Sequence, residues 1–193
     1  INPRIVYCEL TGYGVKGPFV NDADHDLGFA SLAGITSMSG EKEGRPAIPG
    51  FQVADMHAAA LGGIALLGAV RHAEKTGLGQ QIPISLFDAA LTLMPGVAAA
   101  YFGNGKVHER GNNWLTGTNP NYNIYATKDN RYLAVGCLEA KFWNNLCRVC
   151  GHPEWQEQIQ DQDCYPQLIK ELTACFKNYT LTEWEKLLAG KDT

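Results

Sequence analysis

The sequence predicts an α/β fold followed by a smaller α+β domain. Over residues 1–103, apolar spacing and turn residues predict the order strand, helix, helix, strand, helix, which is typical of an α/β layer with part of a parallel sheet. Four glycines and five asparagines between residues 103 and 121 then break the pattern. We therefore expect residues 1–103 to form part of a large domain, residues 104–121 to be a linker or a binding loop, and residues 122–193 to form a small domain.

The sequence predicts two strands and two shorter helices of the α/β layer. The β-rich runs at residues 5–10 and 80–84 predict strands, and the spacing at residues 27–38 predicts a helix. Ser85, with Asp88 three residues later, resembles a capping box. This motif predicts a further helix that extends to about residue 102.

The longest helix is expected to begin at residue 51. Its apolar pattern continues to about residue 70, and Gly77 marks the end of the helix. Residues 58–70 are so rich in alanine and glycine that another backbone could approach the helix closely. This apolar stretch is too short to span a bilayer and carries two central glycines. We therefore expect no membrane partner.

The small domain is expected to begin with a hairpin formed by residues 122–127 and 131–137. Helices are expected after it, at residues 140–150 before Gly151, at residues 165–178, and after the capping box of Thr180 and Glu183.

Composition narrows the class of protein. The chain has 193 residues, of which 45% are hydrophobic and 19% charged, as in an ordinary soluble domain with a core. A formal net charge of −4 without a basic cluster argues against nucleic acid as a partner. No signal peptide or transit segment is visible, so we expect a cytoplasmic protein, or a peroxisomal or mitochondrial one in a eukaryote. The chain starts without methionine in an apparent strand, which predicts a fragment or an excised domain.

Six cysteines allow two interpretations. Cys147 and Cys150 form the only close pair, with no second pair and no matching histidines to complete a zinc site. Free or buried thiols in a reducing compartment are the simpler interpretation. We therefore expect no metal.

Three carboxylates and a histidine crowd the start of the helix expected at residues 27–38. They are Asp22, Asp24, His25 and Asp26. Capping and the helix dipole explain one acid at a helix N-terminus, but not three acids with a histidine. From these residues alone, a solvated cap and a functional cluster both stay open.

Two further carboxyl groups also have two interpretations. Asp55 lies at the start of the long apolar helix, either as an N-cap or as a group in a low-dielectric pocket that would raise its pKa. Glu139 follows the strand run at residues 132–138, where sites of α/β proteins usually form. It is equally explained as a first-turn acid of the next helix.

These motifs, in this order, resemble the family III CoA-transferases, and among them most closely the α-methylacyl-CoA racemases. The likeness extends over nearly the whole chain, although members of the family are considerably longer. The matching stretches are residues 2–7, 10–18, 24–34, 53–55, 76–80 and 122–142.

The resemblance implies an interlocked dimer, in which each subunit has a Rossmann-like large domain and a small domain around the active site. It implies that His25 and Asp55 are the two acid/base groups and that Glu139 supports His25. The backbone N–H of Asp26 and the side chain of Tyr13 are expected to contact the substrate. In the family's transferases the aspartate is instead the nucleophile and the histidine is usually absent, so His25 favours a racemase.

The reaction that the resemblance implies inverts the carbon α to the thioester of a 2-methyl-branched acyl-CoA, by proton transfer through an enolate. No cofactor is expected, because coenzyme A is part of the substrate, and the expected partner is a second copy of the chain. Two alternatives stay open. One is a CoA-transferase in which Asp55 accepts the acyl group, and the other is a non-catalytic truncated module that binds CoA or dimerises.

Overall fold

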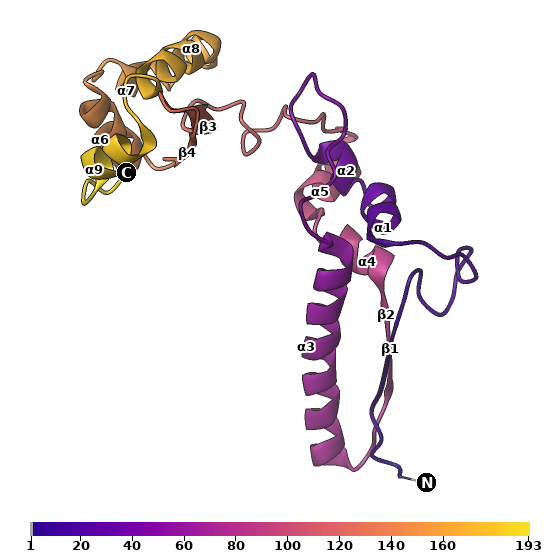
Figure 1. The fold of residues 1–193 in the computed structure, drawn as a ribbon. Coiled ribbons are helices and arrows are strands. Elements are labelled where there is room, and N and C mark those ends of the chain that lie inside the picture. Colours follow the sequence, from indigo (N-terminus) through magenta and orange to yellow (C-terminus); the bar gives the residue numbers. More distant parts are fainter. Residues whose placement is uncertain (1) are drawn as a thin grey trace. The chain divides into compact units, whose positions relative to one another are not determined.

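The structure is a computed structural model that describes residues 2–193. The chain forms two compact units, one that ends at Arg110 and one that begins at Gly111 (Figure 1). This boundary falls inside the segment predicted to be a linker or a binding loop. Both units combine helices with strands, which confirms the predicted α/β class with a smaller α+β part.

The first unit contains a parallel pair of strands. β1 (Tyr7–Thr11) and β2 (Gln81–Ser85) pair in register from Tyr7 opposite Gln81 to Thr11 opposite Ser85. Parallel neighbours need a long crossover connection, and here it carries α1 (Asp26–Leu32), α2 (Ile35–Met38) and α3 (Val53–Thr76). The predicted part of a parallel sheet is therefore confirmed as a two-stranded parallel pair.

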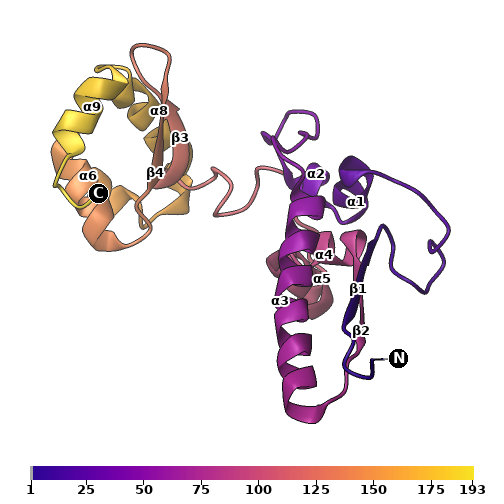
Figure 2. The ribbon, with the colours of Figure 1, turned by 60° about the horizontal axis from the view of Figure 1, so that its bottom comes forward.

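α3 lies along both strands in Figures 1 and 2. A side-chain carbon placed on Gly62 would lie 3.5 Å from Leu10 and 3.9 Å from Ile84, so this part of the helix packs directly on the side chains of the sheet. The fully buried residues of the helix are all small, namely Ala54, Ala58, Gly62, Ala69 and Ala73.

The full length of α3 corrects the expectation that its apolar stretch is too short to span a bilayer. The helix has 24 residues and a mean hydropathy of 1.6 over its most apolar window, so length and composition alone would allow it to cross a bilayer. Only 22% of that window is buried. Within the first unit, α3 packs on β1 and β2. Its outer face exposes Met56, Ile64, Leu67 and Val70.

The helix predicted at residues 27–38 is in fact two helices, α1 and α2. They are separated at Gly34, which has a φ of 89° and so adopts the left-handed conformation that glycine accepts most readily. The prediction of one continuous helix was wrong because this local backbone preference outweighs the apolar spacing.

A second helix is broken by a proline. Ser85 begins it as predicted, since its hydroxyl oxygen accepts the N–H of Asp88 at 3.0 Å. However, α4 (Leu86–Leu91) ends early and α5 (Pro95–Asn104) begins anew. Pro95 has no N–H to continue the hydrogen-bond ladder, but it is well suited to the first position of a helix.

The second unit is built on a hairpin. β3 (Tyr122–Ala126) and β4 (Tyr132–Gly136) pair antiparallel, as predicted, and the helices gather around them in Figure 2. The short elements α7 (Trp155–Gln158) and η1 (Gln162–Cys164) were not predicted, because a single turn is too short to display a period. The helical elements are α6 (Ala140–Cys150), α7 (Trp155–Gln158), η1 (Gln162–Cys164), α8 (Tyr165–Phe176) and α9 (Leu181–Leu188).

Tryptophan side chains fill the core of this unit. Trp143, Trp155 and Trp184 are at most 2% exposed. Each indole N–H has an acceptor: Trp143 donates to the Trp155 carbonyl at 3.1 Å, Trp155 to the Glu171 carboxylate at 2.8 Å, and Trp184 to the Phe176 carbonyl at 2.9 Å. The core therefore buries large apolar area without leaving these donors unsatisfied.

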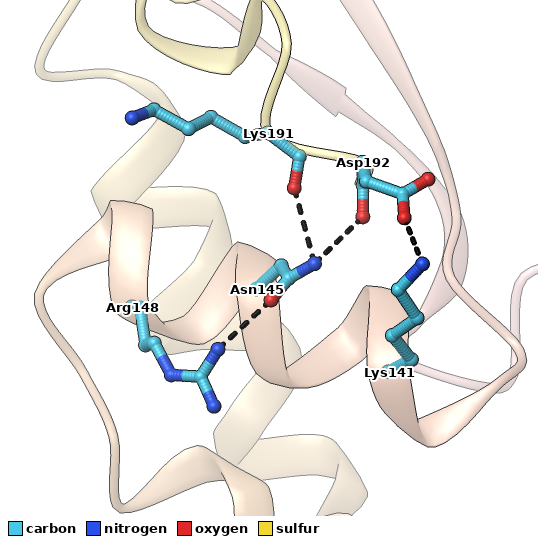
Figure 3. Close-up of polar contacts among 5 residues, drawn as sticks. All are labelled: Lys141, Asn145, Arg148, Lys191 and Asp192. Atoms are coloured by element: carbon cyan, nitrogen blue, oxygen red, sulfur yellow. Dashed lines mark hydrogen bonds and ion pairs between the residues drawn. The ribbon is translucent and has the colours of Figure 1, made fainter.

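α6 is also held by the segment that follows α9 (Figure 3). Asn145 Nδ2 donates to the carbonyl oxygens of Lys191 and Asp192, at 3.1 and 3.0 Å, and Asn145 Oδ1 accepts from Arg148 at 2.8 Å. Lys141 forms an ion pair with Asp192. These contacts fix the orientation of the helix within the second unit.

One carboxylate joins the start of α1 to the start of α3. Asp26 Oδ1 accepts the backbone N–H of Ala54 at 2.7 Å and that of Asp55 at 3.2 Å. Gln52, which immediately precedes α3, makes no capping bond with its side chain. Asp26 therefore satisfies the first-turn N–H groups of α3 from another helix, and the two helix starts are fixed side by side.

Removal of this carboxylate is expected to destabilise the chain. Asp26→Ala should lower the free energy of unfolding by about 1–2 kcal/mol, the range for a lost N-cap, and Asp26→Asn should lose less because it keeps an acceptor oxygen. Urea unfolding measures both. Asp22→Ala removes a neighbouring exposed carboxylate and should change stability by less than about 0.5 kcal/mol. An equal loss in Asp22→Ala would contradict the cap.

A second stability test concerns Gly79. A side-chain carbon at this position would lie 1.7 Å from the carbonyl oxygen of Ile5, which is backbone and cannot easily move. Gly79→Ala should therefore lower the free energy of unfolding by about 2–3 kcal/mol. Gly68→Ala, where nothing lies within 4 Å, should raise it by about 0.5–1 kcal/mol through helix propensity. Thermal unfolding shifts of the same sign in both variants would contradict this packing.

Candidate active site

His25 immediately precedes α1 and has an extended backbone, with φ −117° and ψ 173°. Its carbonyl oxygen accepts the N–H of Gly28 at 2.9 Å and that of Phe29 at 3.3 Å. Its own N–H donates to Asp24 Oδ1 at 2.8 Å. The residue is exposed, and its side chain makes no capping bond to the first turn of α1. The backbone is thus held on both sides while the imidazole is available to a bound molecule.

Asp55 lies in the first turn of α3, and its backbone N–H donates to Asp26 Oδ1. Since Asp26 directly follows His25, this hydrogen bond joins the start of α1, which His25 precedes, to the first turn of α3, which carries Asp55. Asp55 is exposed. Of the two interpretations left open for Asp55, the low-dielectric pocket is therefore not formed within the first unit, because the residue is exposed there.

Such a pair can exchange protons with one bound molecule. An imidazole both accepts and donates a proton near neutral pH, and a carboxyl group can do the same when its surroundings are adjusted. Because the two groups are carried by different helices, they can address one substrate atom from different directions. Their common anchor, Asp26, fixes their backbones relative to each other.

Asp26 has a structural role that the sequence did not predict. Its side chain caps α3, whereas the expectation concerned its backbone N–H as a donor to the substrate. Asp26 is the first residue of α1, and the N–H groups of a first turn have no acceptor within their own helix. The position is therefore that expected of a backbone donor.

Tyr13 lies on the loop after β1 and lines a cavity of about 410 Å³. Its hydroxyl donates to Asp24 Oδ2 at 3.1 Å. Burial raises the pKa of Tyr13, and the hydrogen bond to Asp24 and the charge of that carboxylate raise it further. Tyr13 is therefore a lining residue of this cavity that also contacts Asp24, the residue before His25. Its other lining residues are Gly14, Val15, Lys16, Gln81, Pro83, Ser85 and Asp88.

Glu139 belongs to the second unit, where it immediately precedes α6. It is exposed, and its carbonyl oxygen accepts the N–H of Trp143 at 3.1 Å. It follows β4 closely, as the sequence predicted. Its neighbours Leu138 and Ala140 line a cavity of about 270 Å³. That Glu139 supports His25 stays a prediction.

Two residues beside His25 escaped the sequence reasoning. Asp24 was seen only as one acid among three, but its carboxylate contacts both Tyr13 and the His25 backbone. Gly28 lies within α1, and a side-chain carbon there would be 1.8 Å from Asp24 Oδ2. A glycine inside a helix is unfavourable, so its presence was a signal for a close contact.

The histidine, cysteine, aspartate and glutamate side chains are the possible metal ligands among the described residues. Across residues 2–193, no three side chains of histidine, cysteine, aspartate or glutamate gather so that they could hold a metal ion. All six cysteines are free thiols. Burial raises the pKa of Cys147 to about 12, so this thiol stays protonated at neutral pH.

Comparison with known proteins identifies the protein family of the chain. The family model for CoA-transferase family III matches residues 1–193. The alpha-methylacyl-CoA racemase of Homo sapiens is 29% identical over 99% of this chain and 50% of its own length. The succinyl-CoA–L-malate CoA-transferase beta subunit of Chloroflexus aurantiacus is 33% identical over 80% of this chain and 38% of its own. The chain thus spans half the length, or less, of these curated relatives.

A solved structure agrees. A CAIB/BAIF family protein from Brucella suis has a TM-score of 0.79 and 25% sequence identity, over 97% of this chain and 51% of its own. The likeness in sequence and in fold extends over nearly the same residues. The chain belongs to CoA-transferase family III.

Proposed function

We propose that the chain carries the proton-transfer groups of a racemase that inverts the carbon α to the thioester of a 2-methyl-branched acyl-CoA. One observation supports this most: Asp26 joins the helix starts that bear His25 and Asp55. A two-base inversion of a single carbon needs an acid/base group on each face, because one group takes the proton from one face while the other delivers a proton to the opposite face, and two adjoining helix starts can carry such a pair.

In the proposed reaction, His25 and Asp55 exchange roles according to the direction. One group removes the α-proton and leaves an enolate, and the other returns a proton to the opposite face of the same carbon. The enolate oxygen needs hydrogen-bond donors, and we propose the backbone N–H of Asp26 as one of them. Glu139 would orient the imidazole of His25 and stabilise its protonated form.

The substrate, the assembly and the cofactor requirement are parts of the same proposal. The thioester acidifies the α-hydrogen, so the side chains named above would suffice without a further cofactor. The name of the human relative supports a 2-methylacyl chain. We propose a homodimer as the active assembly, on the resemblance to the family.

A CoA-transferase is the second candidate. Asp55 is exposed at a helix start, so its carboxylate could attack the thioester carbonyl, release coenzyme A as thiolate and form a mixed anhydride. The transferase named among the relatives supports this alternative. His25 favours the racemase. A transferase passes the acyl group to its carboxylate without removing the α-proton, so it needs no imidazole to hold that proton.

The first test follows α-proton exchange. The chain, incubated with a 2-methylacyl-CoA in deuterated water, should incorporate deuterium at the α-carbon, as mass spectrometry measures. His25→Ala should slow incorporation by roughly 10²–10⁴-fold, the usual contribution of a general acid/base group. His72→Ala, at an exposed histidine of α3, is the matched control and should exchange like the unaltered chain. Exchange at the unaltered rate in His25→Ala would remove the two-base mechanism.

The second test separates the two candidates at Asp55. A racemase should form no acyl-enzyme, so hydroxylamine added during turnover should leave no hydroxamate at this residue. Asp55→Asn should reduce α-exchange by about 10²-fold or more, because the amide cannot transfer the proton. Glu74→Gln alters an exposed carboxylate on the same helix and should have no effect. A trapped Asp55 hydroxamate would favour the transferase. Binding of acyl-CoA without exchange or adduct would indicate a non-catalytic module.

A further inference from the structure

The carboxylate of Asp24 is committed to two contacts on opposite sides. Oδ1 accepts the backbone N–H of His25 at 2.8 Å, and Oδ2 accepts the hydroxyl of Tyr13 at 3.1 Å. Tyr13 lies eleven residues earlier, on the loop after β1. The carboxylate therefore connects that loop to the backbone of the proposed catalytic histidine.

Gly28 creates the space that this carboxylate occupies. A side-chain carbon at Gly28 would lie 1.8 Å from Asp24 Oδ2, 2.0 Å from Cγ and 2.1 Å from Oδ1. All three atoms of the carboxyl group thus sit against the bare backbone of the first turn of α1. Any other residue at this position would push the carboxylate away from both of its partners.

Tyr13 is itself held by aromatic packing. Its ring lies edge-on to Phe29 with the centroids 5.1 Å apart, and it contacts Phe19 and Phe87 at 5.5 and 6.0 Å. Phe29 is only 2% exposed and belongs to α1. The ring of Tyr13 is therefore held by three aromatic contacts while its hydroxyl donates to Asp24.

From this geometry we infer that Asp24 and Tyr13 are positioning residues for the proposed reaction, and that Gly28 is required for them to act. Asp24 fixes the backbone N–H of His25, while the first turn of α1 fixes its carbonyl oxygen. With both peptide groups held, the imidazole starts from one defined backbone position. The inference rests on the proposed role of His25, and it adds to that role the residues that locate it.

The kinetic test compares variants that disturb the carboxylate in different ways. Asp24→Ala removes it, and Gly28→Ala displaces it while keeping it in the chain. Both should lower kcat for α-proton exchange by roughly 10- to 100-fold with little change in KM, because a shift of about 1 Å at a catalytic group has an effect of this size. The double variant should lose no more than the larger single loss, since both changes break one unit. Asp24→Asn keeps an acceptor oxygen and should recover part of the rate.

A second measurement does not depend on turnover. Hydrogen exchange of the His25 amide, followed by NMR, should be slow in the unaltered chain and at least ten-fold faster in Asp24→Ala and Gly28→Ala. The ring carbon signal of Tyr13 should titrate at a lower pH in Asp24→Asn than in the unaltered chain, because the hydrogen bond and the negative charge of Asp24 raise the pKa of this phenol. Burial, the first cause of the raised pKa, should remain.

Asp22→Ala is the control for charge, because it removes a neighbouring carboxylate that does not contact the His25 backbone. It should leave both the rate and the His25 amide unchanged. Unaltered kinetics in Asp24→Ala, in a chain that exchanges α-protons, would overturn the inference and leave the proposed function standing. An unaltered His25 amide in both variants would overturn it whether or not the chain turns over. A chain without exchange activity would instead overturn the proposed function, and with it the role in catalysis.

Discussion

The hydrogen bonds from the starting turn of α3 to Asp26 are the constraint on which the candidate site depends. A helix beginning presents N–H groups that its own backbone cannot satisfy, and α3 has no side-chain cap of its own at Gln52. The carboxylate of Asp26 supplies the acceptor from a neighbouring helix. Because Asp26 adjoins His25, the same contact that completes α3 also joins the segment that carries His25 to the helix start that carries Asp55. The interaction that caps α3 is therefore also the interaction that positions the candidate site.

A second layer of support surrounds this contact. Asp24 holds the N–H of His25, Tyr13 holds Asp24, and an aromatic cluster holds Tyr13. Small residues support the unit along the length of α3, where the buried alanines and Gly62 let the helix lie directly on β1 and β2. In the first unit, the polar contacts thus lie at the helix starts, and the close packing lies along the length of α3. Asp55 remains exposed, so a less polar environment would have to come from outside this unit or from the substrate itself.

Local signals in the sequence predicted most of the elements. Ser85, Thr180 and Gly151 acted where expected, since a cap or a left-handed glycine needs only its immediate neighbours. Apolar spacing misled at Gly34 and Pro95, where backbone preferences divide helices that the spacing would continue. The candidate residues came from the resemblance to a family. The partners of Asp26 could not be predicted, because they lie 28 and 29 residues away and no periodicity connects them.

That separation has a consequence for how the chain folds. A contact between residues so far apart in sequence forms only after the intervening loop has closed, which is entropically unfavourable and slow compared with the winding of a helix. The central turns of α3 can therefore form early, while its beginning frays until α1 docks. The two helix starts would be joined only in that last step, so partly folded molecules would contain the long helix without the arrangement on which the proposed function depends.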